Sequence, residues 1–89
     1  MATVAVIDSK TGDLCDVFAV YCRVLRIRYS DGDDFSYLVL GKNRLEDFSI
    51  EEVIINIFKD PGEAMDLVDR LDAMLHDEKK ELPPEKMII

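Results

Sequence analysis

The sequence predicts an α+β domain, with a three-stranded antiparallel β-meander followed by two α-helices packed on one face of the sheet. Three observations support this class. β-Prone runs separated by turn-forming residues fill the first half, apolar residues recur at helical spacing in the second half, and two helix-start signals are present there. With 89 residues, 48% of them hydrophobic, the chain can form one small core. We expect a single domain over 1–82 and a C-terminal tail over 83–89.

The first two strands are predicted within residues 2–30. A β-prone run over 2–8 precedes turn-forming residues, so a return strand is expected from about residue 14. Valines and aromatic residues over 14–30 favour a strand, which is the interpretation we adopt. Apolar residues also recur at helical intervals behind Asp13, which leaves a short helix near 13–22 as the alternative.

The meander continues with a hairpin around an Asp-Gly-Asp turn. Apolar residues alternate with polar ones on both sides of this turn. A two-residue loop would set Ile27 opposite Ser36, whereas a loop of three or five residues would set Ile27 opposite Tyr37 and gather the apolar residues on one face. We therefore expect the odd-numbered loop, with Arg26 and Arg28 on the other face.

Each of the two predicted helices begins with a start signal. Ser49 and Glu52 form a capping box, in which each side chain would accept a backbone N–H bond from the other residue, so a helix is expected from residue 50. Its apolar stripe would consist of Ile50, Val53, Ile54, Ile57 and Phe58. Asp60, followed by Pro61, starts a second helix over 61–80. That helix is expected to bury Ala64, Leu67, Val68, Leu71, Met74 and Leu75.

Charge is distributed unevenly along the chain. The net charge is −8 and the isoelectric point is about 4.4. Residues 45–78 hold eleven acidic side chains against two basic ones, whereas residues 17–30 hold three arginines and no acid. Nucleic-acid phosphates and anionic membranes repel an acidic chain, so we expect neither direct nucleic-acid binding nor membrane binding. A basic protein surface is the expected partner.

The sequence also indicates a compartment. The chain opens on a short apolar run without a basic lead, which is not the pattern of a secretion signal. No apolar run approaches the roughly 18 residues of a membrane span. Cys15 and Cys22 are the two cysteines, and in a single strand their odd offset would place the thiols on opposite faces. We expect a cytoplasmic protein with free thiols.

The residue types that carry chemistry form no known motif. The aspartates of the hairpin turn do not match a calcium loop, because Phe35 and Ser36 fall where an acid and a glycine are required. His76 is the single histidine, and the cysteine spacing fits no zinc site. Both cysteines lie in apolar sequence, where a thiol is unreactive. We expect no metal, no cofactor and no enzymatic activity.

The second predicted helix carries a row of carboxylates. Glu63, Asp66, Asp69 and Asp72 recur every three residues, with a rise of about 4.5 Å per step, so they form an acidic spiral about as dense as a nucleic-acid backbone. The plain alternative is a solvated helix face that keeps a small protein soluble. Ile55 and Met65 lie off the apolar stripes, where they would be exposed anchors for a partner or would pack on the sheet or tail. The predicted partner-binding residues are Glu51, Glu52, Ile55, Met65, Asp66, Asp69, Asp72 and His76.

These observations predict a non-enzymatic inhibitor whose acidic half occupies a basic cleft of another protein, including a cleft built for nucleic acid. In size, charge and sheet-plus-helices layout, the chain resembles the small acidic inhibitors that phages encode against host defences, anti-CRISPR proteins among them. A second hypothesis is a structural or adaptor subunit that forms a homodimer through its surplus apolar residues, Ile55 and Met87, Ile88 and Ile89. A third is an antitoxin-like partner that neutralises a basic toxin.

Overall fold

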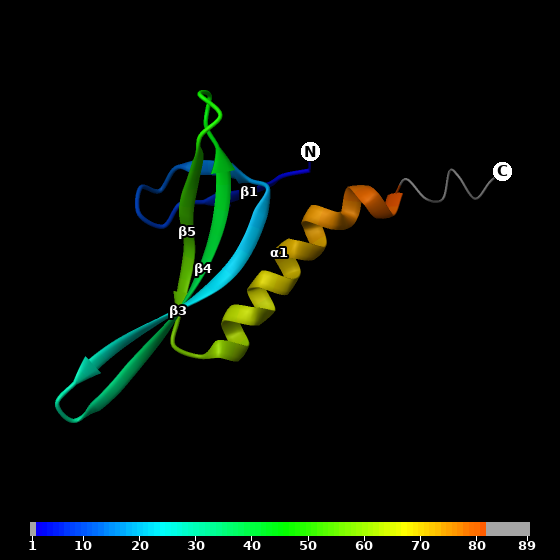
Figure 1. Ribbon diagram of the computed structural model, residues 1–89. Coiled ribbons are helices and arrows are strands. Elements are labelled where there is room, and N and C mark those ends of the chain that lie inside the picture. Colours follow the sequence, from blue (N-terminus) through cyan, green and yellow to red (C-terminus); the bar gives the residue numbers. More distant parts are fainter. Residues whose placement is uncertain (1, 82–89) are drawn as a thin grey trace.

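The computed structural model describes residues 2–81. Within them, five antiparallel strands in two sheets precede one α-helix (Figure 1). In chain order, the elements are β1 (Val4–Ile7), β2 (Leu14–Val17), β3 (Ala19–Tyr29), β4 (Gly32–Arg44), β5 (Ile50–Phe58) and α1 (Pro61–Glu81). β1 pairs with β2, and β3, β4 and β5 form a second sheet in that order. The predicted tail over 83–89 lies outside the described residues.

The predicted three-stranded meander with two helices is wrong, because the first expected helix is the strand β5 and the sheets hold five strands. Other elements agree with the prediction. β1 lies within the expected first strand, and α1 matches the second predicted helix. Residues 14–30 are strand rather than helix, as expected, but the single expected strand is broken at Phe18 into β2 and β3, which belong to different sheets. None of the described residues forms a helix long and apolar enough to span a membrane.

The capping box that predicted the first helix closes a hairpin instead. The backbone N–H and the hydroxyl of Ser49 both donate to Asp47 Oδ1, at 3.0 and 2.6 Å. The N–H of Leu45 donates to the Ser49 carbonyl at 2.9 Å, and Phe48 adopts a left-handed φ of 70°. Serine and aspartate side chains stabilise turns through such local bonds as readily as they cap helices. The residues that suggested a helix cap therefore stabilise the turn between β4 and β5.

A β-bulge explains why the apolar residues of β5 show helical spacing. Leu40 lies opposite Ile54, whereas the preceding Val39 lies opposite Asn56, so Ile55 is an extra residue in the strand. A bulge interrupts the alternation of side chains between faces. The period of two that would have predicted a strand is lost here, although isoleucine and valine favour strands.

The core forms where the β1–β2 hairpin, the larger sheet and α1 meet. The buried cluster consists of Val4, Val6, Val17, Val53 and Leu75. α1 contacts β1, β3, β4 and β5, so it covers the larger sheet and reaches the hairpin. Gly41 of β4 permits this packing: a Cβ at that position would lie 2.7 Å from Val17 Cγ1, which is too close for two carbon atoms.

A two-stranded arm extends beyond this core. β5 ends opposite Tyr37, so residues 25–36 of β3 and β4 continue without a third strand, and we call them the arm. Figure 1 shows the arm projecting away from the helix and from the β1–β2 hairpin. The Cα radius of gyration is 16.4 Å, against about 12 Å for a compact chain of this length. The molecule is accordingly elongated, 64 × 32 × 19 Å along its principal axes.

The predicted odd-numbered loop at the arm tip is wrong. Tyr29 lies opposite Gly32, which leaves a two-residue turn, and Ile27 lies opposite Asp34 rather than Tyr37. Gly32 has a φ of 142°, a conformation that side chains rarely adopt. The prediction assumed that one face of the hairpin is buried. Because the arm leaves the core, burial does not select its register.

Candidate protein-binding surfaces

The outer face of α1 is the first candidate surface. The helix begins after Asp60, whose Oδ2 accepts the Glu63 N–H at 3.0 Å as an N-cap. Ala64 and Leu75 are buried on the inner side. The exposed side presents Met65, Asp66, Asp69, Asp72 and His76, together with Glu63 and Arg70. All five of these predicted partner-binding residues are exposed, and Asp72 and His76 lie at the edge of the helix that borders the start of β3. Met74, which was expected in the core, is 58% exposed.

This face keeps an excess of negative charge. Arg70 pairs with Asp66 at 3.0 Å, and the ring nitrogen Nδ1 of His76 lies 3.6 Å from Asp72 Oδ2. Glu63 and Asp69 form no ion pair within residues 2–76. Within residues 2–76, the four carboxylates of α1 therefore have one arginine partner between them, at Asp66. The excess negative charge attracts a cationic surface.

The three predicted site residues on β5 do not join this surface. Glu52 accepts two bonds from Arg23, at 2.7 and 3.0 Å, and one from the Tyr21 hydroxyl. The Tyr21 bond, and then the Arg23 bond, lower the pKa of the Glu52 carboxyl below its ordinary value of 4.5. Glu51 accepts a long bond from the Asn43 side chain at 3.4 Å. Ile55 is partly buried and packs against the core cluster, so it is not an exposed anchor.

The arginines of β3 do not neutralise α1. Arg23 pairs with Glu52, and Arg26 pairs with Asp33 across the arm at 2.6 Å. Arg28 forms no ion pair with any residue in the described part of the chain. Of the acidic segment 45–78, Glu52 is therefore neutralised by an arginine of β3, whereas, within residues 2–76, the carboxylates of α1 are not.

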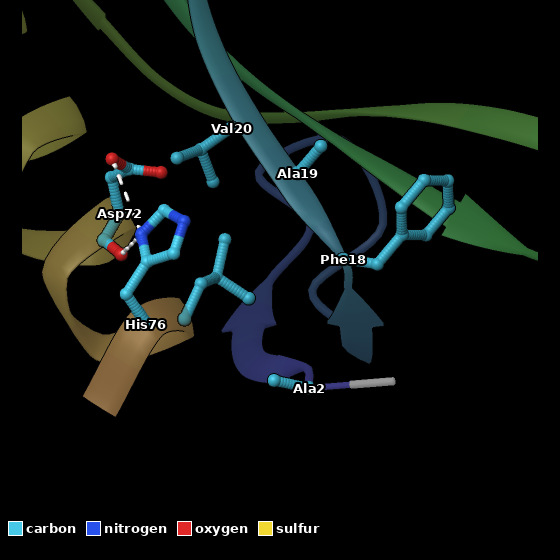
Figure 2. A pocket seen from close by; sticks show the side chains of 7 residues that line it. Ala2, Phe18, Ala19, Val20, Asp72 and His76 are labelled. Carbon is cyan, nitrogen blue, oxygen red and sulfur yellow. Dashed lines mark hydrogen bonds and ion pairs between the residues drawn. The ribbon is translucent and has the colours of Figure 1, made fainter. Parts of the chain in front are cut away.

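A hollow of about 400 Å³ lies between the C-terminal half of α1 and the start of β3 (Figure 2). Its lining residues are Ala2, Phe18, Ala19, Val20, Asp72, Leu75 and His76. His76 is held against its own helix, because Nδ1 lies 2.9 Å from the Asp72 carbonyl oxygen. Among residues 2–76, the lining offers one imidazole and one carboxylate over an apolar floor, and none of these lining residues is a serine, threonine, cysteine or lysine that could act as a nucleophile.

The other chemically reactive groups are dispersed. Cys15 and Cys22 are free and half-buried, and burial, followed by the charges of Asp8 and Glu51, raises the pKa of the Cys15 thiol. A raised pKa keeps the thiol protonated and unreactive. Within residues 2–76, no group of three or more histidine, cysteine, aspartate or glutamate side chains is placed to hold a metal ion.

The arm is a second candidate surface, which the sequence analysis missed. Four of its side chains, Leu25, Ile27, Tyr29 and Phe35, are between 39% and 57% exposed, as is Val24 at its base. Clusters of exposed apolar side chains on a small protein mark sites of interaction. The alternation over 25–40 was visible in the sequence, but it gave no sign that β5 stops short of the arm.

Comparison of the chain with protein-family models, with curated proteins and with solved structures found no match.

Proposed function

We propose that this chain is a non-enzymatic protein-binding module whose acidic α1 face occupies a basic surface of another protein and thereby inhibits it. The observation that supports the proposal is the row of exposed carboxylates along α1, Glu63, Asp66, Asp69 and Asp72, of which Asp66 alone pairs with an arginine within residues 2–76. Exposed helices that serve only solubility usually pair acids with bases one turn away. The two free cysteines agree with action in a reducing compartment such as the cytoplasm.

The geometry of α1 suits a cleft made for nucleic acid. Successive carboxylates in the row are separated by about 4.5 Å along the helix axis and by about 60° around it, so the row winds around the helix at an axial spacing comparable to that of backbone phosphates. Met65 lies beside the row and is 47% exposed, so it supplies an apolar contact that a partner would desolvate. Long-range attraction would make association fast and dependent on salt. Inhibition would follow because the bound helix excludes the partner's own anionic ligand.

The proposal is tested by reversing charge on α1. The immobilised chain is used to capture proteins from a cell lysate at low salt, bound proteins are eluted with a salt step, and the eluted proteins are identified by mass spectrometry. The variant D66K/D69K/D72K should lose the captured protein because its α1 face becomes cationic. Circular dichroism should show an unchanged fold, since all three aspartates are exposed.

A matched control carries the same change in net charge elsewhere. Asp13, Asp16 and Glu46 are exposed and lie outside α1, so D13K/D16K/E46K should still capture the partner. The captured protein is then purified, and its nucleic-acid affinity is measured by fluorescence anisotropy with and without the chain. Equal capture by the α1 variant and the control, or an unchanged nucleic-acid affinity of the partner, would contradict the proposal.

A further inference from the structure

β3 is a long edge strand. In the described part of the chain it pairs only with β4, so the backbone groups along its other edge have no strand partner. The opposite edge of the sheet is partly covered, because the N–H of Ser9 donates to the Ile54 carbonyl at 2.9 Å. Figure 1 shows that the arm portion of β3 lies clear of α1. Where it lies clear of α1, this edge is a template for pairing with another strand.

Exposed apolar side chains flank this edge on both faces. Residues that lie opposite each other in an antiparallel pair share a face. Leu25, Ile27 and Tyr29 therefore lie on one face of the arm, whereas Phe35, which lies opposite Arg26, is on the other. A two-stranded ribbon is marginally stable in water. A strand added at the edge would cover apolar side chains on both faces of the arm. A partner seated on one face would cover those of that face only.

The arginines restrict how two copies of β3 could pair with each other. A two-fold axis perpendicular to the sheet keeps both faces continuous only if a residue lies opposite its own copy at the axis. An axis at Arg23, Arg26 or Arg28 sets an arginine opposite its own copy. An axis at Ile27 sets Arg26 opposite Arg28 of the second copy. Like charges directly opposite each other are destabilising, so these arrangements are disfavoured.

Between Arg23 and Arg28, two axis positions remain, at Val24 and at Leu25. Either one sets every arginine of β3 opposite an apolar residue of the second copy. The same two positions carry exposed apolar side chains, at 55% and 47% exposure. With the axis at either of these two neighbouring positions, the β3 edge is therefore complementary to its own copy in charge and in hydrophobicity.

We propose that two copies of this chain form a symmetric dimer by pairing the outer edges of β3 antiparallel, with the two-fold axis at Val24 or Leu25. The two three-stranded sheets then become one six-stranded sheet. This inference goes beyond the proposed function and uses a surface on which none of the α1 carboxylates lies. Its failure would leave the α1 proposal intact.

The first test is the mass in solution. Light scattering from micromolar to submillimolar concentration should show the mass rising from 10.2 kDa toward twice that value. The variant Leu25→Lys should stay monomeric, because the new cation would lie opposite its own copy with the axis at Leu25 and opposite Arg23 of the second copy with the axis at Val24. Ile57→Lys is the matched control: Ile57 is 53% exposed on the other edge strand, and its variant should dimerise as the parent chain does. A monomeric mass for the parent chain at every concentration would overturn the proposal.

The second test locates the axis and does not depend on a charged substitution. In a chain whose Cys15 and Cys22 are replaced by alanine, Val24→Cys or Leu25→Cys should form an intermolecular disulfide under mild oxidation. A disulfide requires Cβ atoms about 4 Å apart, which only residues next to the axis reach. Ile57→Cys serves as the control and should cross-link only slowly. Equal rates at positions 24, 25 and 57 would count against the β3 pairing even if the chain dimerises.

Discussion

Replacing Gly41 with alanine should destabilise the fold, because the glycine is the point at which β2 packs against β4. The added Cβ would lie 2.7 Å from Val17 Cγ1 and 3.2 Å from Ile55 Cδ1. Ordinary carbon contacts are about 3.5–4.0 Å, so the overlap with Val17 is near 1 Å. Val17 is fully buried and has no solvent into which to move. Overpacking of this kind costs about 2 kcal/mol.

Thermal unfolding followed by circular dichroism measures this cost. For a domain of this size, about 2 kcal/mol corresponds to a fall in the unfolding midpoint of roughly 8–16 °C. Lys42→Ala, at the next and exposed position, is the control and should change the free energy of unfolding by less than about 0.5 kcal/mol. A Gly41→Ala variant as stable as the parent chain would refute the packing of the hairpin on β4.

A double-mutant cycle makes the reasoning specific to Val17. Val17→Ala alone should cost about 2 kcal/mol, from two lost methyl groups and the cavity they leave. In the double variant, the closest overlap is removed and the new methyl group fills part of the cavity. The combined cost should fall below the sum of the single costs by about 1–2 kcal/mol. Additive costs would show that the clash lies elsewhere.

Three further predictions concern single local features. Asp60→Ala should lower the free energy of unfolding in urea by about 1 kcal/mol, because the helix loses its N-cap, whereas Asp60→Asn should retain most of the stability. Glu52→Gln should make the urea midpoint depend less on pH in the acid range. Folding lowers the pKa of the Glu52 carboxyl, so the stability that this group contributes is present above pH 4.5 and is lost as the pH falls through the folded pKa. An unchanged dependence of the midpoint on acid pH would contradict the prediction. Phe48→Gly should raise the thermal midpoint slightly, since Phe48 is exposed at a left-handed φ of 70° that costs a side chain about 1 kcal/mol; a lower midpoint would mean that its side chain packs against a neighbour.

The elements that the sequence predicts well are those whose local signals agree with one another. In α1, the cap at Asp60, the first-turn proline and the apolar stripe all favour a helix, and the helix begins where they indicate. In β3 and β4, strand-forming residues alternate with polar ones on both sides of a turn. An element can be predicted from the sequence when its independent local preferences agree.

β5 could not be predicted because two of its signals are ambiguous at short range. A serine followed three residues later by glutamate caps a helix or closes a turn, and the choice here depends on Asp47, which holds Ser49. The bulge at Ile55 exists only because β4 lies alongside. The strand therefore depends on pairing with residues distant in the sequence, which a local pattern does not contain.

The same limit decided which site residues could be found. The α1 residues all lie outside the buried stripe of the helix because helical spacing fixes them relative to one another, so their exposure follows from the sequence alone. Glu52 and Ile55 were placed on a predicted helix that is the strand β5, and the structure directs one toward Arg23 and the other toward the core. The exposure of the arm depends on where β5 ends, which is again a matter of tertiary pairing.

The two proposed surfaces differ in the kind of interaction they use, and salt separates them. Binding through the α1 carboxylates is a charge interaction between exposed groups, so it weakens as ionic strength rises and the screening length falls below about 8 Å. Pairing along β3 depends on backbone hydrogen bonds and on apolar side chains such as Leu25, while the net charge of −8 on each copy opposes it. Salt screens that repulsion and leaves apolar burial in place. Raising the salt concentration should therefore release the basic partner and favour the dimer, which assigns each interaction to its surface before any residue is changed.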